Sequence, residues 1–271
     1  MAAPTDVLWL GNDGPPPPNP QTESVFHLST AGDVLLPTLP NVSATGIAFD
    51  GTFLYFNNDG ELAKRDLTGT LLADVLLSPP KAGANSEDLA YDVSTGLLWR
   101  MDNFVPDDPS DPDVPVGGAP KVTKFNPLTR VVANTFYVAP AVALLPPGGV
   151  RWGGLGIAHD QPGNRLFLSF EAEPAPFPNG VVLVRDLTTG ATDVLFQSTG
   201  FQTGGMDYDP DTQTLWIGGA DFVRHISLDP AFIDPAGTTI VDLASSAILA
   251  TVKNSSGRFV DGLAFVRGRC P

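Results

Sequence analysis

The chain has 271 residues, of which 28 are Gly and 27 are Pro, and its formal net charge at pH 7 is −15. This length allows one large domain or two small ones, and the surplus of acidic residues excludes a nucleic-acid partner, because both surfaces would be negative. The longest apolar runs, at residues 70–77 and 138–145, are too short to cross a bilayer, so we expect no membrane insertion.

A six-residue pattern recurs along the chain and is typical of a short buried strand, because it is apolar and bounded by turn-forming residues. The copies read TGIAFD at residues 45–50, EDLAYD at 87–92, LGIAHD at 155–160, GGMDYD at 204–209 and DGLAFV at 261–266. Internal repeats of this kind indicate a fold built from similar supersecondary units.

Each copy is matched by a leucine–aromatic pair that predicts a second strand. The pairs are Leu8-Trp9, Leu54-Tyr55, Leu98-Trp99, Leu166-Phe167 and Leu215-Trp216. Third strands are predicted at SVFHLSTAG, ELAKRDLTG, KVTKFNPLT, VVLVRDLTTG and FVRHISLDP, and outer strands at DVLLPTL, TLLADVLL, RVVANTFYV, TDVLFQS and TTIVDLA. Four antiparallel strands per repeat is the blade of a β-propeller.

The sequence therefore predicts an all-β fold, a single β-propeller over residues 1–271 with five blades of four antiparallel strands. Because Leu8-Trp9 and DGLAFV lie at opposite ends of the chain, the N- and C-terminal strands should share one blade and close the ring. Six blades remain an alternative, since residues 230–259 are long enough for a further hairpin.

The repeats resemble those of NHL-type and gluconolactonase-like (senescence-marker) β-propellers, in their Asp/Glu-Gly-Leu/Ile-Ala-aromatic-Asp strands and leucine–aromatic pairs. Gluconolactonase-like proteins usually have six blades and hold a central divalent metal with Glu, Asn and Asp ligands. The resemblance implies that Asp261, in VDGLAF, and Glu87, in SEDLAYD, occupy equivalent strand starts.

Acidic and amide side chains also cluster at the starts of the predicted inner strands and after the leucine–aromatic pairs. Carboxylate and amide oxygens arranged around one axis suit Ca²⁺. The predicted ligands are Glu87, Asp102, Asp261 and Asn58. The alternative is that these side chains cap turns by bonding their own backbone.

Three further residues are candidates for ligand binding at the same end of the channel. Arg151 and Trp152 lie in a loop entering an inner strand and could stack on a sugar or another planar ligand, and Glu171 follows a leucine–aromatic pair. Asp207 occupies a position that is Ala in the other four copies, so it is a candidate general base, as is Glu87. The alternative for Asp207 is a structural carboxylate that is satisfied by hydrogen bonds. His159 takes an aromatic position, which favours packing.

The leading functional hypothesis is a secreted or periplasmic binding protein, its signal peptide removed, with an acidic channel mouth and a structural Ca²⁺. Its partner would be a small molecule, a saccharide or a protein. A metal-dependent hydrolase of lactonase or phosphoesterase type is the alternative, and a five-bladed glycoside hydrolase is a further one. The single cysteine, Cys270, excludes an internal disulfide but does not reveal the compartment.

Overall fold

The computed structural model describes residues 6–11, 24–33, 39–40, 42, 44–58, 61–76, 85–173, 180–198, 203–219, 222–228, 248–253 and 259–268. Within these ranges the regular secondary structure is all β, apart from one 3₁₀ turn, Val142–Leu144 (η1). No described helix is long and apolar enough to cross a membrane.

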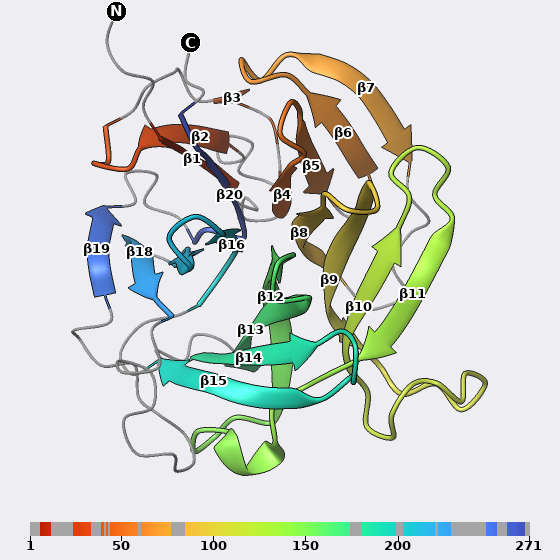
Figure 1. The fold of residues 1–271 in the computed structure, drawn as a ribbon. Helices are drawn as coiled ribbons and strands as arrows, with labels where there is room; N and C mark the ends of the chain where they lie inside the picture. Colours follow the sequence, from red (N-terminus) through yellow and green to blue (C-terminus); the bar gives the residue numbers. More distant parts are fainter. Residues whose placement is uncertain are drawn as a thin grey trace, which may run out of the picture.

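Five four-stranded antiparallel sheets surround one axis, and they are called blades A to E here (Figure 1). From the axis outward, blade A contains β20 (Gly262–Val266), β1 (Val7–Gly11), β2 (Ser24–Ser29) and β3 (Leu39–Pro40). Blade B contains β4 (Gly46–Phe49), β5 (Leu54–Asn58), β6 (Glu61–Arg65) and β7 (Leu71–Leu76). Blade C contains β8 (Ser86–Asp92), β9 (Leu97–Val105), β10 (Ala119–Phe125) and β11 (Val132–Tyr137).

The last two blades have the same order of strands. Blade D contains β12 (Arg151–Asp160), β13 (Arg165–Glu173), β14 (Gly180–Asp186) and β15 (Thr192–Ser198). Blade E contains β16 (Met206–Asp209), β17 (Thr214–Ile217), β18 (Phe222–Ser227) and β19 (Ile248–Lys253). The fold is therefore a five-bladed β-propeller, as the repeat predicts.

The predicted closure of the ring is also confirmed. In blade A the C-terminal strand β20 pairs with the N-terminal strand β1, with Ala264 opposite Trp9. The innermost strand β20 in turn contacts β16 of blade E and β4 of blade B, so the inner strands form a continuous ring. The two ends of the chain thus close the propeller, because β20 covers the edge of β1 that would otherwise be unpaired.

One predicted strand is wrongly placed. The sequence pattern TTIVDLA, at residues 238–244, favours the outer strand of blade E, but the strand that pairs with β18 is β19, ten residues further on. Val252 of β19 is buried opposite Val223, which gives this segment an apolar face toward blade A. Residues 238–244, and most of the region considered for a sixth blade, lie outside the described residues.

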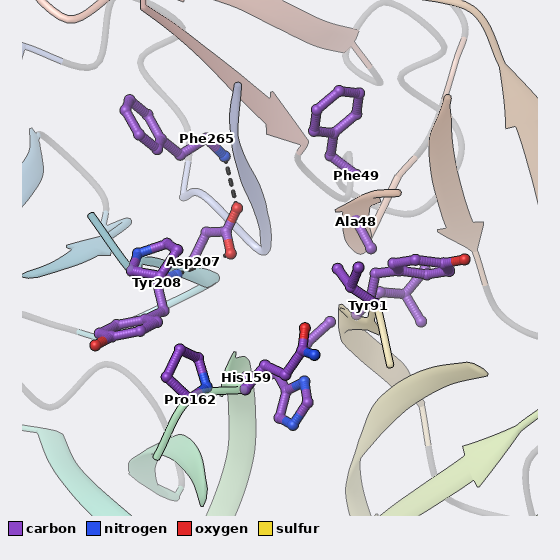
Figure 2. Close-up of a pocket in the computed structure, with 13 residues that line it drawn as sticks. Ala48, Phe49, Tyr91, His159, Pro162, Asp207, Tyr208 and Phe265 are labelled. Atoms are coloured by element: carbon purple, nitrogen blue, oxygen red, sulfur yellow. Dashed lines mark hydrogen bonds between the residues drawn. The ribbon is translucent and has the colours of Figure 1, made fainter. Parts of the chain in front are cut away.

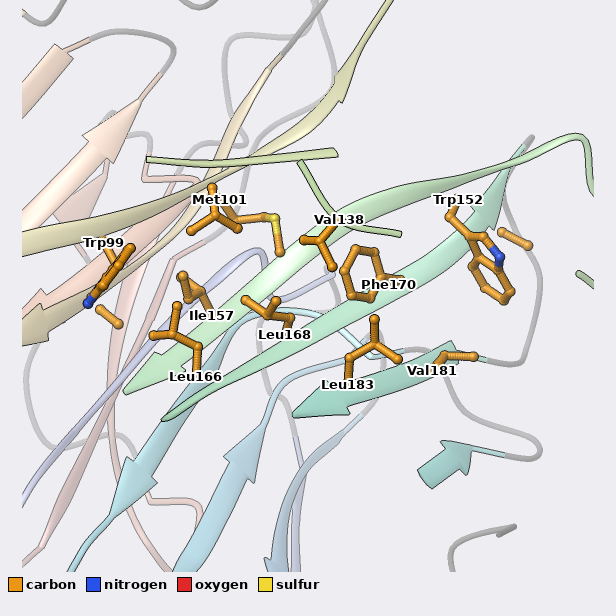
Figure 3. Packing of buried hydrophobic residues seen from close by; sticks show 13 residues of the cluster. Trp99, Met101, Val138, Trp152, Ile157, Leu166, Leu168, Phe170, Val181 and Leu183 are labelled. Atoms are coloured by element: carbon orange, nitrogen blue, oxygen red, sulfur yellow. The ribbon is translucent and has the colours of Figure 1, made fainter. Parts of the chain in front are cut away.

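The hydrophobic core is divided among the interfaces between blades. Each of the five largest buried clusters draws its residues from two neighbouring blades, as the cluster between blades C and D illustrates (Figure 3). A flat sheet that buries both faces needs a neighbour on each side. The stability of every blade therefore depends on completion of the ring.

The aromatic residues of the second strands occupy equivalent buried positions, as their spacing predicts. Their exposed fractions are 2% for Trp9, 5% for Tyr55, 2% for Trp99, 0% for Phe167 and 3% for Trp216. Each lies opposite the fourth residue of the six-residue pattern, which is Ala in four blades. A small residue at that position leaves room for a large ring beside it.

The second position of the pattern lies where the five inner strands come closest together. Four blades have glycine there, and the fifth has an aspartate: Gly46, Asp88, Gly156, Gly205 and Gly262. A Cβ on Gly46 would lie 2.4 Å from the Glu87 carbonyl oxygen, and one on Gly262 would lie 2.7 Å from the Gly46 Cα. Only one side chain fits at this level of the axis, and it belongs to Asp88.

The Asp88 carboxylate joins its own blade to the other four. It is fully buried and accepts hydrogen bonds from the next residue of the pattern in every other blade. The donors are the backbone N–H groups of Met206 at 2.7 Å, Ile157 at 3.3 Å, Ile47 at 3.4 Å and Leu263 at 3.4 Å. Burial raises the pKa of Asp88 well above its usual range, whereas these N–H groups stabilise the charged form and oppose the rise.

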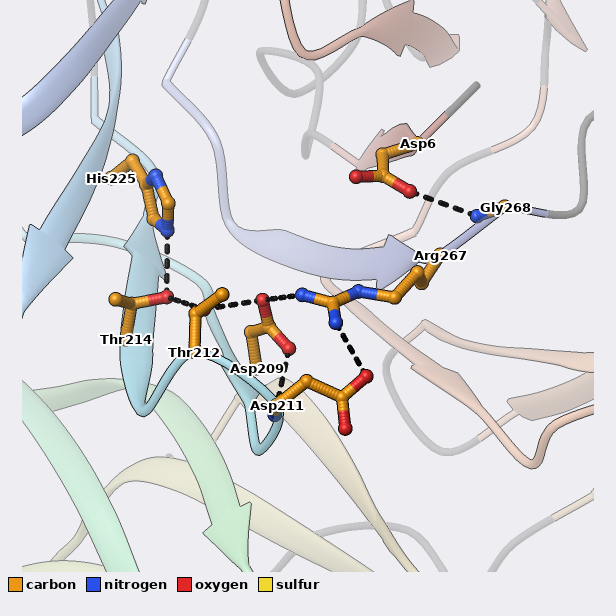
Figure 4. A network of polar contacts seen from close by, with 8 residues as sticks. All are labelled: Asp6, Asp209, Asp211, Thr212, Thr214, His225, Arg267 and Gly268. Atoms are coloured by element: carbon orange, nitrogen blue, oxygen red, sulfur yellow. Dashed lines mark hydrogen bonds and ion pairs between the residues drawn. The ribbon is translucent and has the colours of Figure 1, made fainter. Parts of the chain in front are cut away.

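A polar clasp reinforces the junction between blades A and E (Figure 4). Arg267, directly after β20, forms ion pairs with Asp209 and Asp211 at the turn between β16 and β17. The N–H group of Gly268 donates to Asp6 Oδ1 at 2.9 Å, just before β1. The end of the C-terminal strand β20 is therefore bound both to blade E, through Arg267, and to the residue before β1 in its own blade, through Gly268.

Replacing Asp88 tests its role at the axis. We expect Asp88→Ala to lower the free energy of unfolding by more than about 4 kcal/mol, because each buried donor left unpaired costs about 1–3 kcal/mol. Urea denaturation measures this change. Asp66→Ala is the matched control, since Asp66 accepts N–H bonds from Thr68 and Thr70 within one exposed turn. Equal losses for the two variants would contradict the proposed role.

Removal of the closing strand tests the ring. Deleting residues 261–271 takes away β20 and leaves β1 as an unpaired edge, so the shortened chain should aggregate or lose cooperative unfolding. Size-exclusion chromatography and thermal unfolding followed by circular dichroism measure both effects. A soluble monomer with an unchanged Tm would show that closure is dispensable.

Candidate functional site: an axial pocket at the ends of the inner strands

A cavity of about 420 Å³ lies on the propeller axis, at the end where the inner strands finish, and is called the axial pocket here. All five inner strands contribute their aromatic fifth position or its equivalent to its wall (Figure 2). The lining residues are Ala48, Phe49, Leu89, Ala90, Tyr91, Val93, His159, Gln161, Pro162, Asp207, Tyr208, Pro210 and Phe265.

The wall of this pocket is fixed by packing between neighbouring blades. The Tyr91 ring stacks on Tyr55 of blade B with centroids 6.0 Å apart, and Phe265 stacks on Trp216 of blade E at 5.6 Å. Tyr208 packs against Phe167 of blade D in a tilted arrangement, with centroids 5.5 Å apart. Because each ring is held by its neighbour, the pocket has its shape before any ligand arrives.

Asp207 is the only carboxylate among the described residues that line the axial pocket. It stands at the fourth position of the pattern, where the other blades have Ala. Its Oδ2 accepts the Phe265 N–H from blade A at 2.8 Å, and its Oδ1 accepts the Tyr208 N–H at 2.8 Å (Figure 2). These two bonds hold the carboxylate in one orientation beside the cavity.

The surroundings of Asp207 favour its neutral form. Burial is the largest cause and raises the pKa of this carboxyl, the two N–H bonds lower it, and the nearby Asp209 charge raises it slightly, so that the resulting pKa is about 7. The carboxyl thus changes its charge near neutral pH. Such a group in a cleft is a candidate for binding or proton transfer.

His159 lines the axial pocket and also a second cavity, of about 610 Å³, between blades C and D. Burial lowers the pKa of His159, so its ring is neutral at pH 7. Gln161 also lines both cavities, while Lys124 and Asp92 form an ion pair of 2.5 Å in the second one. The two cavities are therefore neighbours that share two side chains.

The sequence predicts the binding end at the opposite face, where the inner strands begin. Residues 12–23, 59–60, 77–84 and 174–179 lie outside the described residues. Of the predicted site residues, the structure places only Asp207 in the axial pocket. The sequence pattern favours packing for His159 and the aromatic residues at the fifth position. The structure shows that these residues also line a cavity, because all five stand at the same level near the ends of the inner strands.

The three predicted ligand-binding residues meet at the paired ends of β12 and β13. Trp152 is buried in the cluster between blades C and D, and its Nε1 donates to the Ala141 carbonyl at 3.3 Å (Figure 3). Arg151 forms an ion pair with Glu173. Glu171 is largely buried nearby, and burial followed by the charge of Glu173 raises its pKa to about 7. The indole of Trp152 is thus engaged in packing, whereas Arg151 and Glu171 remain partly exposed.

The predicted calcium ligands do not assemble in the described part of the chain. No group of three or more His, Cys, Asp or Glu side chains there could hold a metal ion. Asp102 is bound to Arg100, whose Nε lies 2.8 Å from Oδ1. Glu87 is buried on β8, Asn58 ends β5, and Asp261 precedes β20. The described residues therefore show no assembled acidic metal site, and the calcium site stays a prediction from the sequence.

Comparisons with known proteins add no family to this description. No family model matches the chain, and no curated protein matches it either. Among solved structures, it is similar to a chain in the crystal structure of a nidogen/laminin complex, with a TM-score of 0.49 and 12% identity over 98% of this chain and 100% of that one.

Two further solved structures are similar over most of the chain. The Pan2 WD40 domain of Neurospora crassa has a TM-score of 0.40 and 10% identity over 77% of this chain and 57% of that one. A chain of the mitotic checkpoint complex has a TM-score of 0.41 and 8% identity over 78% of this chain and 50% of that one. Because all three scores are below 0.5, the class of the protein, a five-bladed β-propeller, rests on its own five sheets.

Substituting Asp207 by the residue of the other blades tests its raised pKa. Since the folded-state pKa of about 7 lies above that of an unfolded aspartate, wild-type protein loses stability as the pH rises toward 7. We expect the difference in stability between Asp207→Ala and wild type to move in favour of the variant by about 1–3 kcal/mol between pH 4 and pH 8, on top of a cost at every pH for the two N–H groups that lose their acceptor. Urea denaturation at both pH values measures the difference. A difference that is the same at both pH values would contradict the raised pKa.

Proposed function

We propose that this β-propeller is a binding protein whose ligand occupies the axial pocket. The observation that carries the proposal is a pre-formed cavity of about 420 Å³ on the axis, lined mostly by apolar and aromatic side chains with a few polar groups. Small-molecule sites have this size and composition. The pocket suits a small molecule or one side chain of a peptide.

The position of Asp207 supports a binding role further. Asp207 differs from its counterparts in the repeat, lines a cavity and is costly to bury. Such a residue is typical of a functional site, because functional residues often lower the stability of the fold. The four alanines at equivalent positions provide a stable alternative that the sequence does not use in blade E.

Hydrolysis has less support in the same pocket. Glycoside hydrolysis requires two carboxyl groups on either side of the bond, and Asp207 is the one carboxyl among the described lining residues. A metal-dependent hydrolase needs ligands that converge, which the predicted set does not do in the described residues. A bound calcium ion and a secreted or periplasmic location remain predictions from the sequence.

Blocking the pocket tests this proposal. Val93 is 66% exposed and lines the axial pocket, so Val93→Trp should obstruct it without disturbing the core. A panel of small amines, mono- and disaccharides and short peptides is tested for an increase in Tm, since a ligand of the folded state stabilises it by about 2.7 kcal/mol at a hundredfold excess over Kd. We expect the active compounds to lose their effect in Val93→Trp.

Leu128→Trp is the control for that experiment, because Leu128 is a 74% exposed apolar residue in a turn at the periphery of blade C. It should respond to the same compounds as wild type. Compounds that stabilise Val93→Trp and wild type equally would place the binding site elsewhere and contradict the proposal.

A further inference from the structure

The buried carboxylates of the propeller differ in how their charge is compensated. Four of them have a cationic partner: Asp92 with Lys124, Asp102 with Arg100, Asp160 with Arg165 and Asp209 with Arg267. Asp88 is surrounded by N–H groups from four other blades. The general rule is that a charge removed from water requires compensation of this kind.

Asp207, which is half-buried at the wall of the axial pocket, does not follow this rule within the described residues. It accepts two backbone N–H bonds but takes part in none of the ion pairs found there, and no Lys or Arg lines the axial pocket. Each carboxylate oxygen can accept more than one hydrogen bond, so both retain acceptor capacity after these bonds. Both oxygens can therefore accept further bonds from a cationic group that enters the cavity.

We infer that the axial pocket recognises a ligand through a protonated amine, which pairs with the carboxylate of Asp207. This inference rests on the proposed binding function and adds the chemical class of the ligand. Most of the remaining lining, including Phe49, Leu89 and Phe265, is apolar or aromatic and suits a hydrocarbon or aromatic body attached to the amine. The formal net charge of −15 favours the approach of a cation and disfavours an anion.

Asp207 is also the group whose charge changes near neutral pH in this pocket. Facing it, β8 contributes Tyr91 and β12 contributes His159, while its own strand carries Tyr208 and Asp209. The pKa values of both tyrosines are raised, so these phenols stay neutral between pH 6 and 8, and burial lowers the pKa of His159 below that of free histidine, so its imidazole is mostly neutral from pH 7 upward. Strands β4 and β20 contribute Ala48, Phe49 and Phe265, which carry no charge.

Binding of an amine should therefore become tighter as the pH rises. With the pKa of Asp207 at about 7, its ionised fraction rises from about one tenth at pH 6 to about nine tenths at pH 8, so the affinity should increase about tenfold. The amine remains protonated over this range.

The test uses benzylamine as probe, with benzyl alcohol and benzoate as neutral and anionic probes of similar shape. Binding to the full chain is followed by two-dimensional ¹H–¹⁵N NMR titration at pH 6 and pH 8. We expect benzylamine to bind more tightly than either other probe, with the pH dependence given above, and to shift the amide signals of Tyr208 and Phe265.

Asp207→Ala should weaken benzylamine binding at pH 8 by at least about tenfold and remove its pH dependence. This variant restores the residue of the other four blades, so its fold should be retained, and its thermal unfolding verifies this. Asp193→Ala is the matched control, because Asp193 is an exposed carboxylate on the outer strand β15 and its loss changes the net charge equally.

The outcomes separate this inference from the proposed function. Equal benzylamine affinity in Asp207→Ala and wild type, or tighter binding of benzyl alcohol or benzoate, would overturn the amine assignment. If benzylamine fails while a neutral or anionic compound of the wider panel binds wild type but not Val93→Trp, the axial site stands and the amine inference falls. If no compound binds at the pocket, both are contradicted.

Discussion

The carboxylate of Asp88 is the constraint around which the propeller is arranged. Backbone N–H groups of four inner strands point toward the axis, and a single acceptor placed there satisfies one donor from each blade. This arrangement leaves room for only one side chain at that level, which accounts for the glycines at the equivalent positions of the other blades. The hydrophobic clusters between blades stabilise each interface separately, whereas Asp88 couples all five blades at one point.

A second carboxylate lies further along the axis and has the opposite character. Asp207 is two positions later in the pattern than Asp88, at the level where the inner strands diverge and the axial pocket begins. It accepts two N–H bonds where Asp88 accepts bonds from all four other blades, so more of its charge is left uncompensated. The carboxylate of Asp88 therefore joins the inner strands at one level of the axis, whereas the carboxylate of Asp207 is available to a ligand at the next level.

Much of the fold could be predicted from the sequence because the inner strand and its aromatic partner repeat with nearly constant spacing. The blade count, the shared terminal blade and the burial of Trp9 and Trp216 follow from that spacing. The outer strand of blade E could not be placed, because outer strands have one neighbour and a weaker apolar pattern.

The candidate site was harder to predict, since it depends on three-dimensional packing. Asp207 stands out in the sequence as the one residue that replaces Ala, and the structure places it in the pocket. The signal for Asp88 was equally present, as one aspartate among four glycines, but its meaning requires the converging strands. Trp152 is buried because the segment around Ala141 lies over it, a contact that spacing along the chain does not reveal.

Native-state hydrogen exchange of four amides tests the central role of Asp88 most directly. If one carboxylate couples the blades, the N–H groups of Ile47, Ile157, Met206 and Leu263 should exchange only when the whole propeller unfolds, with one common free energy of opening. Free energies that differ among these amides by more than about 1 kcal/mol, or that lie far below the global free energy of unfolding, would show that the blades open independently and would contradict this account.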